Sequence, residues 1–377
     1  MKRASVGRRG RRDTFLGILA AAAAISLAAC SSSSASSMGE DVGKSVSLDS
    51  MKPVTQYVGP TTAFTAPRDK HIAVVVCGNF GAGCVREGHA VKEAGETLGW
   101  KVDLIDGRLD PTVQNRAVKQ AAESGVDGIV GISANPNLMG EAMAEVAARK
   151  IPYVAMSQAA RTGDVAGVTS YVSLAPQKSG KIIAQWLEAA SDSKAHVLIL
   201  DLPGTPDIMD RNDVIASTLK DSCAECKVYR AEVSAQTVGT SLAPLVTAQL
   251  QQHPDISYVW VLDDAVGEFV AQGIRQAGKS STVKMAGTSS STEASIGHLK
   301  DGTQTADLLW DDYWGGWVAV DSLARAMAGE PVQKEWETPL RLFTPANVDQ
   351  LNSDADKVGW RAEFDYKSKL RQLWGAR

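Results

Sequence analysis

The stretch His71-Ile72-Ala73-Val74-Val75-Val76-Cys77-Gly78-Asn79 begins the folded part of the chain and decides its class. Its five consecutive apolar residues, three of them valine, predict a strand that is buried on both faces. A helical pattern follows at Arg86–Leu98, and a second β-branched run follows at Val102–Ile105. Because continuous apolar strands alternate with helices, we expect a parallel sheet with helices on both faces, which is an α/β fold.

The alternation of strand and helix runs on to residue 172 and is then repeated. In the first set we expect the strands Gly128–Ile132, Tyr153–Met156 and Thr169–Val172 and the helices Val113–Ala122 and Leu138–Ala148. After a linking helix, Ser179–Ala190, the second set has the strands His196–Leu200, Val228–Val233, Tyr258–Leu262 and Val283–Ala286 and the helices Asp207–Lys220, Ser241–Gln252, Gly267–Ala277 and Thr292–Leu299. The pattern predicts two similar doubly wound parallel-sheet lobes. Ligands of such sheets bind beyond the carboxyl ends of the strands, so we expect a cleft between the lobes.

Motifs of catalysis are missing from the sequence. It contains no glycine-rich phosphate loop after a strand, no Gly-x-Ser-x-Gly elbow and no His-Glu-x-x-His pair. The five histidines are scattered and offer no cluster of zinc ligands. We therefore expect a protein that is not an enzyme and that has neither a metal nor a cofactor.

The first 29 residues have the composition of an export signal. Six basic residues face the single acidic Asp13, and an apolar run, Phe15–Ala29, follows. This run is too short to cross a bilayer and has the usual length of a signal-peptide core. Leu27-Ala28-Ala29-Cys30 resembles a bacterial lipobox, which implies cleavage before Cys30 and diacylation of its thiol. An ordinary signal peptide is the alternative, and Arg11-Arg12 leaves the export route open between the general and the twin-arginine pathways.

Residues 30–69 are expected to form the lipidated cysteine and a flexible tether, because Ser31–Pro67 is rich in Ser, Gly, Thr and Pro without apolar periodicity.

The full chain has a formal net charge of −4. Residues 1–29 carry a net charge of +5, so the remainder of the chain has a net charge of −9. Nucleic-acid binders need clustered basic charge, and we therefore expect no nucleic-acid partner.

Four further cysteines form two close pairs, Cys77 with Cys84 and Cys223 with Cys226. Even pairing in an exported protein favours disulfides. A thioredoxin-like redox site is the rival interpretation of Cys223-Ala-Glu-Cys226, but such a motif opens a helix after a strand. Here the pair follows a predicted helix and precedes a strand, which favours a structural clip.

Several segments resemble one family of binding proteins. They are His-Ile-Ala-Val-Val-Val-Cys-Gly-Asn-Phe at 71–80, Leu-Gly-Trp-Lys-Val-Asp-Leu-Ile-Asp-Gly at 98–107, Asp-Pro-Thr-Val-Gln at 110–114, Gly-Val-Asp-Gly-Ile-Val at 125–130 and Val-Leu-Asp-Asp at 261–264. In this order they resemble the type I periplasmic solute-binding proteins, particularly the ribose-binding-like sugar branch, over roughly residues 71–345.

The resemblance implies two lobes joined by a three-segment hinge, with crossings near Ser173–Pro176, Leu309–Asp311 and Thr338–Arg341. The N-terminal lobe would then comprise residues 70–174 and 311–338, and the C-terminal lobe residues 175–310 and 339–347. Residues 348–377 would form a C-terminal extension. We expect this extension to pack on the second lobe, because its tryptophans would otherwise be exposed.

Ligand contacts can be carried over from the family one position at a time. In the first lobe the resemblance implies Asn79 and Phe80 after the first strand, Asn135 after the third, and the uncharged pair Ser157-Gln158 where the sugar branch often has Asp-Arg. In the second lobe it implies Arg211, Asp263 in place of a usual Asn, and Ser289 in place of a usual Asp. Because a carboxylate accepts two hydroxyl hydrogen bonds or pairs with a cation, Asp263 argues against a common aldose.

Three tryptophans, Trp310, Trp314 and Trp317, have the i, i+4, i+7 spacing of one helix face. Trp310 lies at a predicted hinge beside the cleft, where we expect its indole to stack on the CH face of a sugar, while Trp314 and Trp317 are expected in the core. Asp311-Asp312 is expected to open a helix and not to bind a metal.

The resemblance implies a monomeric, lipid-anchored receptor that closes around a small hydroxylated solute, a sugar or polyol, and delivers it to the permease subunits of an ABC importer. Two alternatives stay open. The same cleft would serve a membrane-anchored sensor, or it would bind a small molecule that is not a sugar.

Overall fold

The computed structural model describes residues 48–79, 81–160, 165–289 and 291–375. The expected signal peptide, Cys30 and Phe80 lie outside these residues. Within them, no helix is long and apolar enough to cross a membrane.

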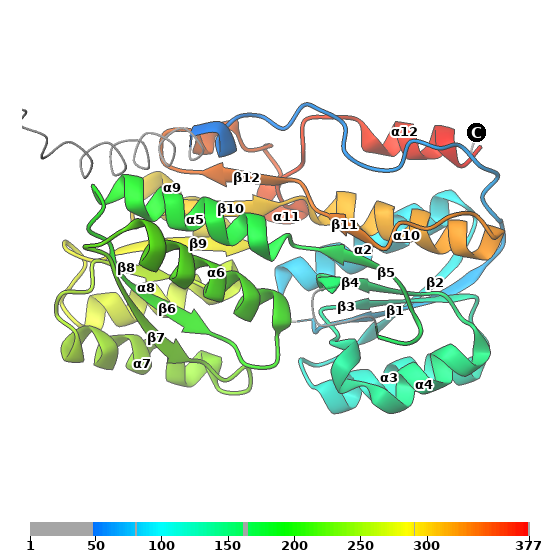
Figure 1. The fold of residues 1–377 in the computed structure, drawn as a ribbon, viewed down its shortest axis with the longest axis horizontal. Helices are drawn as coiled ribbons and strands as arrows, with labels where there is room; N and C mark the ends of the chain where they lie inside the picture. The colour runs from blue at the N-terminus through cyan, green and yellow to red at the C-terminus, as the bar shows by residue number, and fades with distance from the viewer. Residues whose placement is uncertain (1–47, 80, 161–164, 290, 376–377) are drawn as a thin grey trace, which may run out of the picture. The chain divides into compact units, whose positions relative to one another are not determined.

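The first sheet has six parallel strands in the order β11-β5-β4-β3-β1-β2 (Figure 1). They are β1 (His71–Val76), β2 (Lys101–Asp106), β3 (Gly128–Ile132), β4 (Tyr153–Met156), β5 (Val168–Ser173) and β11 (Glu335–Glu337). The helices α2 (Ala82–Thr97) and α10 (Asp312–Ala328) cover one face, and α3 (Pro111–Ser124) and α4 (Gly140–Arg149) cover the other. Every residue of Ile72–Val76 is at most 3% exposed, as a strand covered on both faces must be.

The second sheet repeats this order as β12-β10-β9-β8-β6-β7, with only β12 antiparallel. Its strands are β6 (His196–Asp201), β7 (Lys227–Glu232), β8 (Tyr258–Trp260), β9 (Lys284–Ser289), β10 (Gln304–Trp310) and β12 (Leu340–Phe343). The helices α5 (Pro176–Ala190) and α6 (Pro206–Ser222) cover one face, α7 (Val238–Gln252) and α8 (Gly267–Gln276) the other, and α9 (Glu293–Asp301) precedes β10. Equivalent strand orders confirm the predicted duplication of an α/β unit.

Local sequence signals fix several boundaries. Asp110 begins α3 because its carboxylate accepts hydrogen bonds from the backbone N–H groups of Thr112 and Val113. Gly125 ends the same helix in the left-handed conformation, with φ of 78°. Asp311 begins α10 by accepting from the backbone N–H of Trp314, so the expected helix-opening role of this carboxylate is confirmed.

The chain passes between the two sheets at three places, each of which overlaps a predicted crossing. It leaves β5 at Ser173 and enters α5 at Pro176, leaves β10 at Trp310 and enters α10 at Asp312, and leaves β11 at Glu337 and enters β12 at Leu340. One expectation is wrong here. Trp310 does not share a helix face with Trp314 and Trp317, because it ends β10, whereas the other two lie fully buried in α10.

The expectation of a flexible tether is wrong for residues 51–67, which pack along the folded body. The carbonyl oxygens of Val58 and Pro67 accept hydrogen bonds from the indoles of Trp314 and Trp100, both at 2.8 Å. The carbonyl oxygen of Met51 accepts a hydrogen bond from Nε of Arg341 in β12 at 3.0 Å. The composition of the segment, which is typical of linkers, did not reveal these contacts. They are made by its backbone carbonyl oxygens, which accept hydrogen bonds from buried indole and guanidinium groups.

The C-terminal extension packs as predicted, but on both lobes and not on the second alone. It contains the 3₁₀ turn η4 (Val348–Gln350) and the helices α11 (Ala355–Val358) and α12 (Tyr366–Leu373). Trp360 joins a cluster with Leu309 and Phe343 of the second sheet, whereas Trp374 joins the core beneath α10. The extension also pairs with the N-terminal segment, since Glu363 exchanges hydrogen bonds with Val54 at 2.7 and 2.9 Å.

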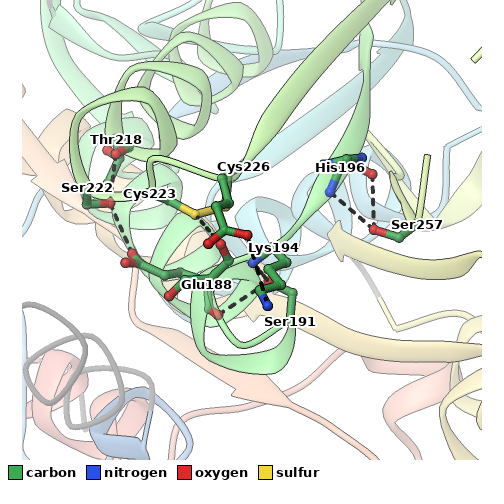
Figure 2. The surroundings of a disulfide bond; sticks show 11 residues. Glu188, Ser191, Lys194, His196, Thr218, Ser222, Cys223, Cys226 and Ser257 are labelled. Atoms are coloured by element: carbon green, nitrogen blue, oxygen red, sulfur yellow. Dashed lines mark hydrogen bonds and ion pairs between the residues drawn. A yellow bond between two sulfur atoms is a disulfide. The ribbon is translucent and has the colours of Figure 1, made fainter. Parts of the chain in front are cut away.

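Both predicted disulfides are present. Figure 2 shows Cys223 and Cys226 in the turn between α6 and β7, where Ser222 at the end of α6 bonds to Glu188 of α5. Cys223 is 3% exposed and belongs to the core of the second lobe. Because the pair follows the end of a helix and lies against the core, the structure favours a structural disulfide over a redox site. The other disulfide joins Cys77, directly after β1, to Cys84 in α2.

Candidate functional site

A cavity of about 590 Å³ lies between the two sheets at the carboxyl ends of their strands. The first lobe contributes the segments that follow β1, β2 and β3, and the second lobe contributes those that follow β6, β7 and β8. This is the position at which open parallel sheets bind their ligands. The interlobe cavity is therefore the candidate site.

Two of the residues expected in the site line the cavity. Asp263 follows β8, and its two carboxylate oxygens accept hydrogen bonds from the backbone N–H of Ala265 and the hydroxyl of Ser289, both at 2.8 Å. Burial raises the pKa of Asp263. Asn135 follows β3 and begins the 3₁₀ turn η1 (Pro136–Leu138), with its side-chain oxygen accepting from the backbone N–H of Asn137 at 3.0 Å.

Arg211 of α6 is buried beside this carboxylate. It is 1% exposed, donates from Nη2 to the carbonyl oxygen of Leu262 at 3.0 Å, and lies over the ring of Trp260 at 5.7 Å. Burial lowers its pKa to about 10, opposed by the negative charges of Asp207 and Asp263. No described residue accepts a hydrogen bond from its Nε, which leaves a buried donor available.

Ser157 and Gln158 follow β4 and are each 3% exposed. The hydroxyl of Ser157 donates to the carboxylate of Glu87 in α2. Burial raises the pKa of Glu87 to about 8, assisted by the charges of Asp263 and Asp207. Within the described part of the chain, Nε2 of Gln158 has no acceptor. The structure thus groups Ser157, Arg211, Asp263 and Ser289 around a cluster of carboxylates.

The remaining expected contacts lie elsewhere or outside the description. Asn79 is exposed and its backbone N–H bonds to Asp106, without joining the cavity lining. Trp310 is 6% exposed in the core of the second lobe, and its indole donates to Asp312 at 2.9 Å. Phe80 is not among the described residues. The ligand contacts of Phe80 and Asn79 stay predictions.

Sequence reasoning missed three charged residues near the site. Glu87 and Arg86 look like ordinary helix-surface charges in a helix that follows the first strand, and Asp207 resembles a common helix-opening acid. In the structure, Arg86 donates to the carbonyl oxygens of Lys357 and Asp356 in the C-terminal extension. Asp207 of α6 instead accepts hydrogen bonds from the backbone N–H groups of Ala159 and Leu174. No single sequence pattern signals either contact, because both partners are distant in the chain.

The described residues contain no group of three His, Cys, Asp or Glu side chains suited to a metal ion. The site therefore combines a carboxylate acceptor that lines the cavity, Asp263, with the buried guanidinium donors of Arg211 beside it. A hydroxyl both donates and accepts hydrogen bonds, so such a mixed set suits polyhydroxylated molecules.

The fold and the cavity define a two-lobed binding protein. A profile of the periplasmic binding protein domain family matches residues 72–331, and the chain belongs to that family. Because the family consists of binding proteins, the expectation that this protein is not an enzyme is confirmed. No curated protein sequence matches the chain.

Solved structures with the same fold come from several bacteria. A 5-methylthioribose transporter solute-binding protein of Thermotoga lettingae, solved with 5-methylthioribose, is 18% identical, with TM-score 0.70 over 84% of this chain and all of its own. An ABC transporter solute-binding protein of Agrobacterium vitis, bound to α-D-tagatopyranose, is 16% identical, with TM-score 0.69 over 78% and 100%. A carbohydrate transporter of Acidothermus cellulolyticus in complex with myo-inositol is 19% identical, with TM-score 0.68 over 77% and 99%. These likenesses confirm the type I periplasmic binding protein fold.

Proposed function

We propose that the protein is the solute receptor of an ABC importer and captures a small sugar or polyol between its lobes. The observation that carries this proposal is the carboxylate of Asp263, which lines the interlobe cavity and has the buried Arg211 beside it, with the Nε of Arg211 lacking a partner among the described residues. Ligand contacts to both lobes would favour the closed state, which the permease subunits recognise. The bound tagatose, inositol and 5-methylthioribose of the structural neighbours support this class of solute.

We further propose that the mature chain is held outside the cytoplasm by lipid on Cys30. The lipobox-like Leu27-Ala28-Ala29-Cys30 supports this placement. Two or three acyl chains bind a membrane stably, at about 0.8 kcal/mol per buried CH₂. Labelling cells with a fatty-acid analogue tests the anchor: the wild type should be labelled and Cys30→Ser should not. Label on the Cys30→Ser variant would contradict it.

A thermal-shift screen of the chain against sugars, polyols, amino acids and nucleosides tests the solute class, because ligand binding to the folded state raises its apparent stability. We expect one hydroxylated compound to shift the unfolding temperature, and Asp263→Ala to abolish that shift. Asp349→Ala, at an exposed position outside the cavity lining, is the matched control and should keep it. A shift in unfolding temperature only with cationic or apolar compounds would contradict a sugar or polyol as the solute, while the proposed receptor function would stand.

Importer and sensor differ in their partners and not in the cleft. Affinity capture from membranes of the producing cell should recover permease and ATPase subunits with the protein. Recovery of a kinase-like receptor in their place would contradict import.

A further inference from the structure

The walls of the interlobe cavity are mostly apolar. The first lobe contributes Leu109, Pro111 and Leu138, and the second contributes Leu202, Ile208 and Val238. Among the described residues that line the cavity, none is aromatic. A cavity that recognised only hydroxyl groups would leave this branched aliphatic surface without a matching ligand group.

Leu138 is an unusually exposed member of this aliphatic lining. It ends the η1 turn and is 51% exposed, one of few large apolar side chains in the described chain that are so accessible. A single exposed leucine on a convex surface is ordinary. Here the leucine lines a concave site together with other aliphatic side chains, which is where exposed apolar surface marks a binding function.

Leu109 on the same side is held in a conformation that leucine rarely adopts. Its φ is 53°, and the preceding Arg108 has φ of 56°. The backbone N–H of Leu109 donates to Cys77 at 2.7 Å and that of Arg108 donates to Asp106 at 2.9 Å, which fixes the turn. Such strain persists where the surrounding structure enforces it, commonly at ligand sites.

Polar side chains such as Asp263, Asn135 and Gln236 line the cavity beside the aliphatic side chains, and both kinds come from both lobes. We infer that the solute is amphipathic, an inference that rests on the function proposed above. Its hydroxylated head bonds at Asp263, and it carries an alkyl, thioalkyl or similar apolar substituent. This substituent lies between Leu109 and Leu138 of one lobe and Ile208 of the other. This assigns the cavity a narrower substrate class than free sugars and polyols.

Matched ligand pairs test the inference. The full chain, carrying Cys30→Ser so that no detergent is needed, is titrated calorimetrically with ribose, arabinose, glucose, galactose and inositol, each compared with its butyl or butylthio derivative. We expect at least one derivative to bind about tenfold or more tightly than its parent, because each buried CH₂ strengthens binding severalfold. Leu138→Ser should remove most of this gain. Leu104→Ser, at a leucine of β2 that is 39% exposed and outside the cavity lining, should keep it.

The outcomes separate this inference from the proposed function. If parent compounds bind and their derivatives bind no more tightly, the inference is overturned while the receptor function stands. If a derivative binds more tightly but Leu138→Ser and Leu104→Ser behave alike, the apolar group lies elsewhere and the inference is likewise overturned. If no member of any pair binds, the sugar or polyol assignment fails together with the inference.

Discussion

The indole of Trp374 stacks on that of Trp317, with ring centroids 5.4 Å apart and an interplanar angle of 7°. Trp317 lies in α10 beneath the first sheet, whereas Trp374 directly follows α12 in the C-terminal extension. Trp374 also donates its indole N–H to Asp321 at 2.8 Å. The stacked pair therefore joins the end of the chain to the core of the first lobe.

Removing this contact should destabilise the whole fold. Replacing Trp374 by alanine leaves a cavity and removes one hydrogen-bond donor from Asp321, which keeps Arg325 as its partner. We expect the free energy of unfolding to fall by about 3 kcal/mol or more. Leu104→Ala, at an exposed position, should change it by less than about 1 kcal/mol. Denaturant unfolding measures both values. Rapid proteolytic loss of the extension from an otherwise intact wild-type body would contradict the packing described.

Asp207 should control the contact between the lobes. Its carboxylate accepts hydrogen bonds from two backbone N–H groups. One is that of Ala159, after β4 of the first lobe, at 2.8 Å, and the other is that of Leu174, in the crossing between β5 and α5, at 3.2 Å. Asp207→Ala leaves these two buried donors unpaired, at a cost of about 1–3 kcal/mol each. We expect lower stability and a larger radius of gyration by X-ray scattering. Asp221→Ala, at an exposed position of the same helix, should change neither; equal effects of both variants would refute the assignment.

The buried carboxyl groups near the cleft predict a pH dependence of stability. Burial raises the pKa of Glu87 to about 8 and that of Asp207 to about 6, both above their values in an unfolded chain. Between the unfolded and folded pKa values, the folded protein binds more protons than the unfolded chain, so its stability falls as the pH rises. We expect a decline from about pH 4.5 to about pH 8.

Glu87→Gln isolates the contribution of one group. The amide cannot titrate, so the variant should lose a smaller part of its stability over the same pH range. Glu123→Gln, at an exposed position of α3, serves as the control and should follow the wild type. Chemical unfolding at several pH values measures the slopes, and identical slopes for Glu87→Gln and wild type would count against burial of Glu87 as the cause.

The sequence predicted the two-lobed fold because its signals are local. Apolar runs such as Ile72–Val76 and capping residues such as Asp110 act over one strand or one helical turn. Strand order then follows from the connections of parallel strands. The short edge strands β11 and β12 were not predicted, since three or four residues carry little periodicity. The seven-residue strand β10 was missed as well.

The site was only partly predictable for the same reason. Asp263 and Asn135 follow strands and could be placed at the cleft from strand ends alone. Glu87 reaches Ser157 across 70 residues and Arg86 reaches Asp356 across 270, contacts that depend on how lobe and extension pack. The same holds for residues 51–67, whose binding surface is formed by residues far along the chain.

The two disulfides should have separable effects. Replacing either pair by serine removes a short covalent loop, and the chain-entropy estimate gives a loss of about 2 kcal/mol in each case. Because Cys77 and Cys84 line the cavity, their replacement should also weaken solute binding. The Cys223 and Cys226 pair, in the turn of Figure 2, serves as the control that lowers stability alone. Equal changes in affinity for both double variants would contradict this division.

The two lobes should close when the solute binds. Spin labels at two exposed positions, residue 123 of α3 and residue 251 of α7, report the distance between the lobes by pulsed electron resonance. With the solute that most stabilises the protein, we expect a shift to a single shorter distance in the wild type and no shift in Asp263→Ala. A distance distribution that stays unchanged when the wild type is saturated with that solute would contradict capture by closure.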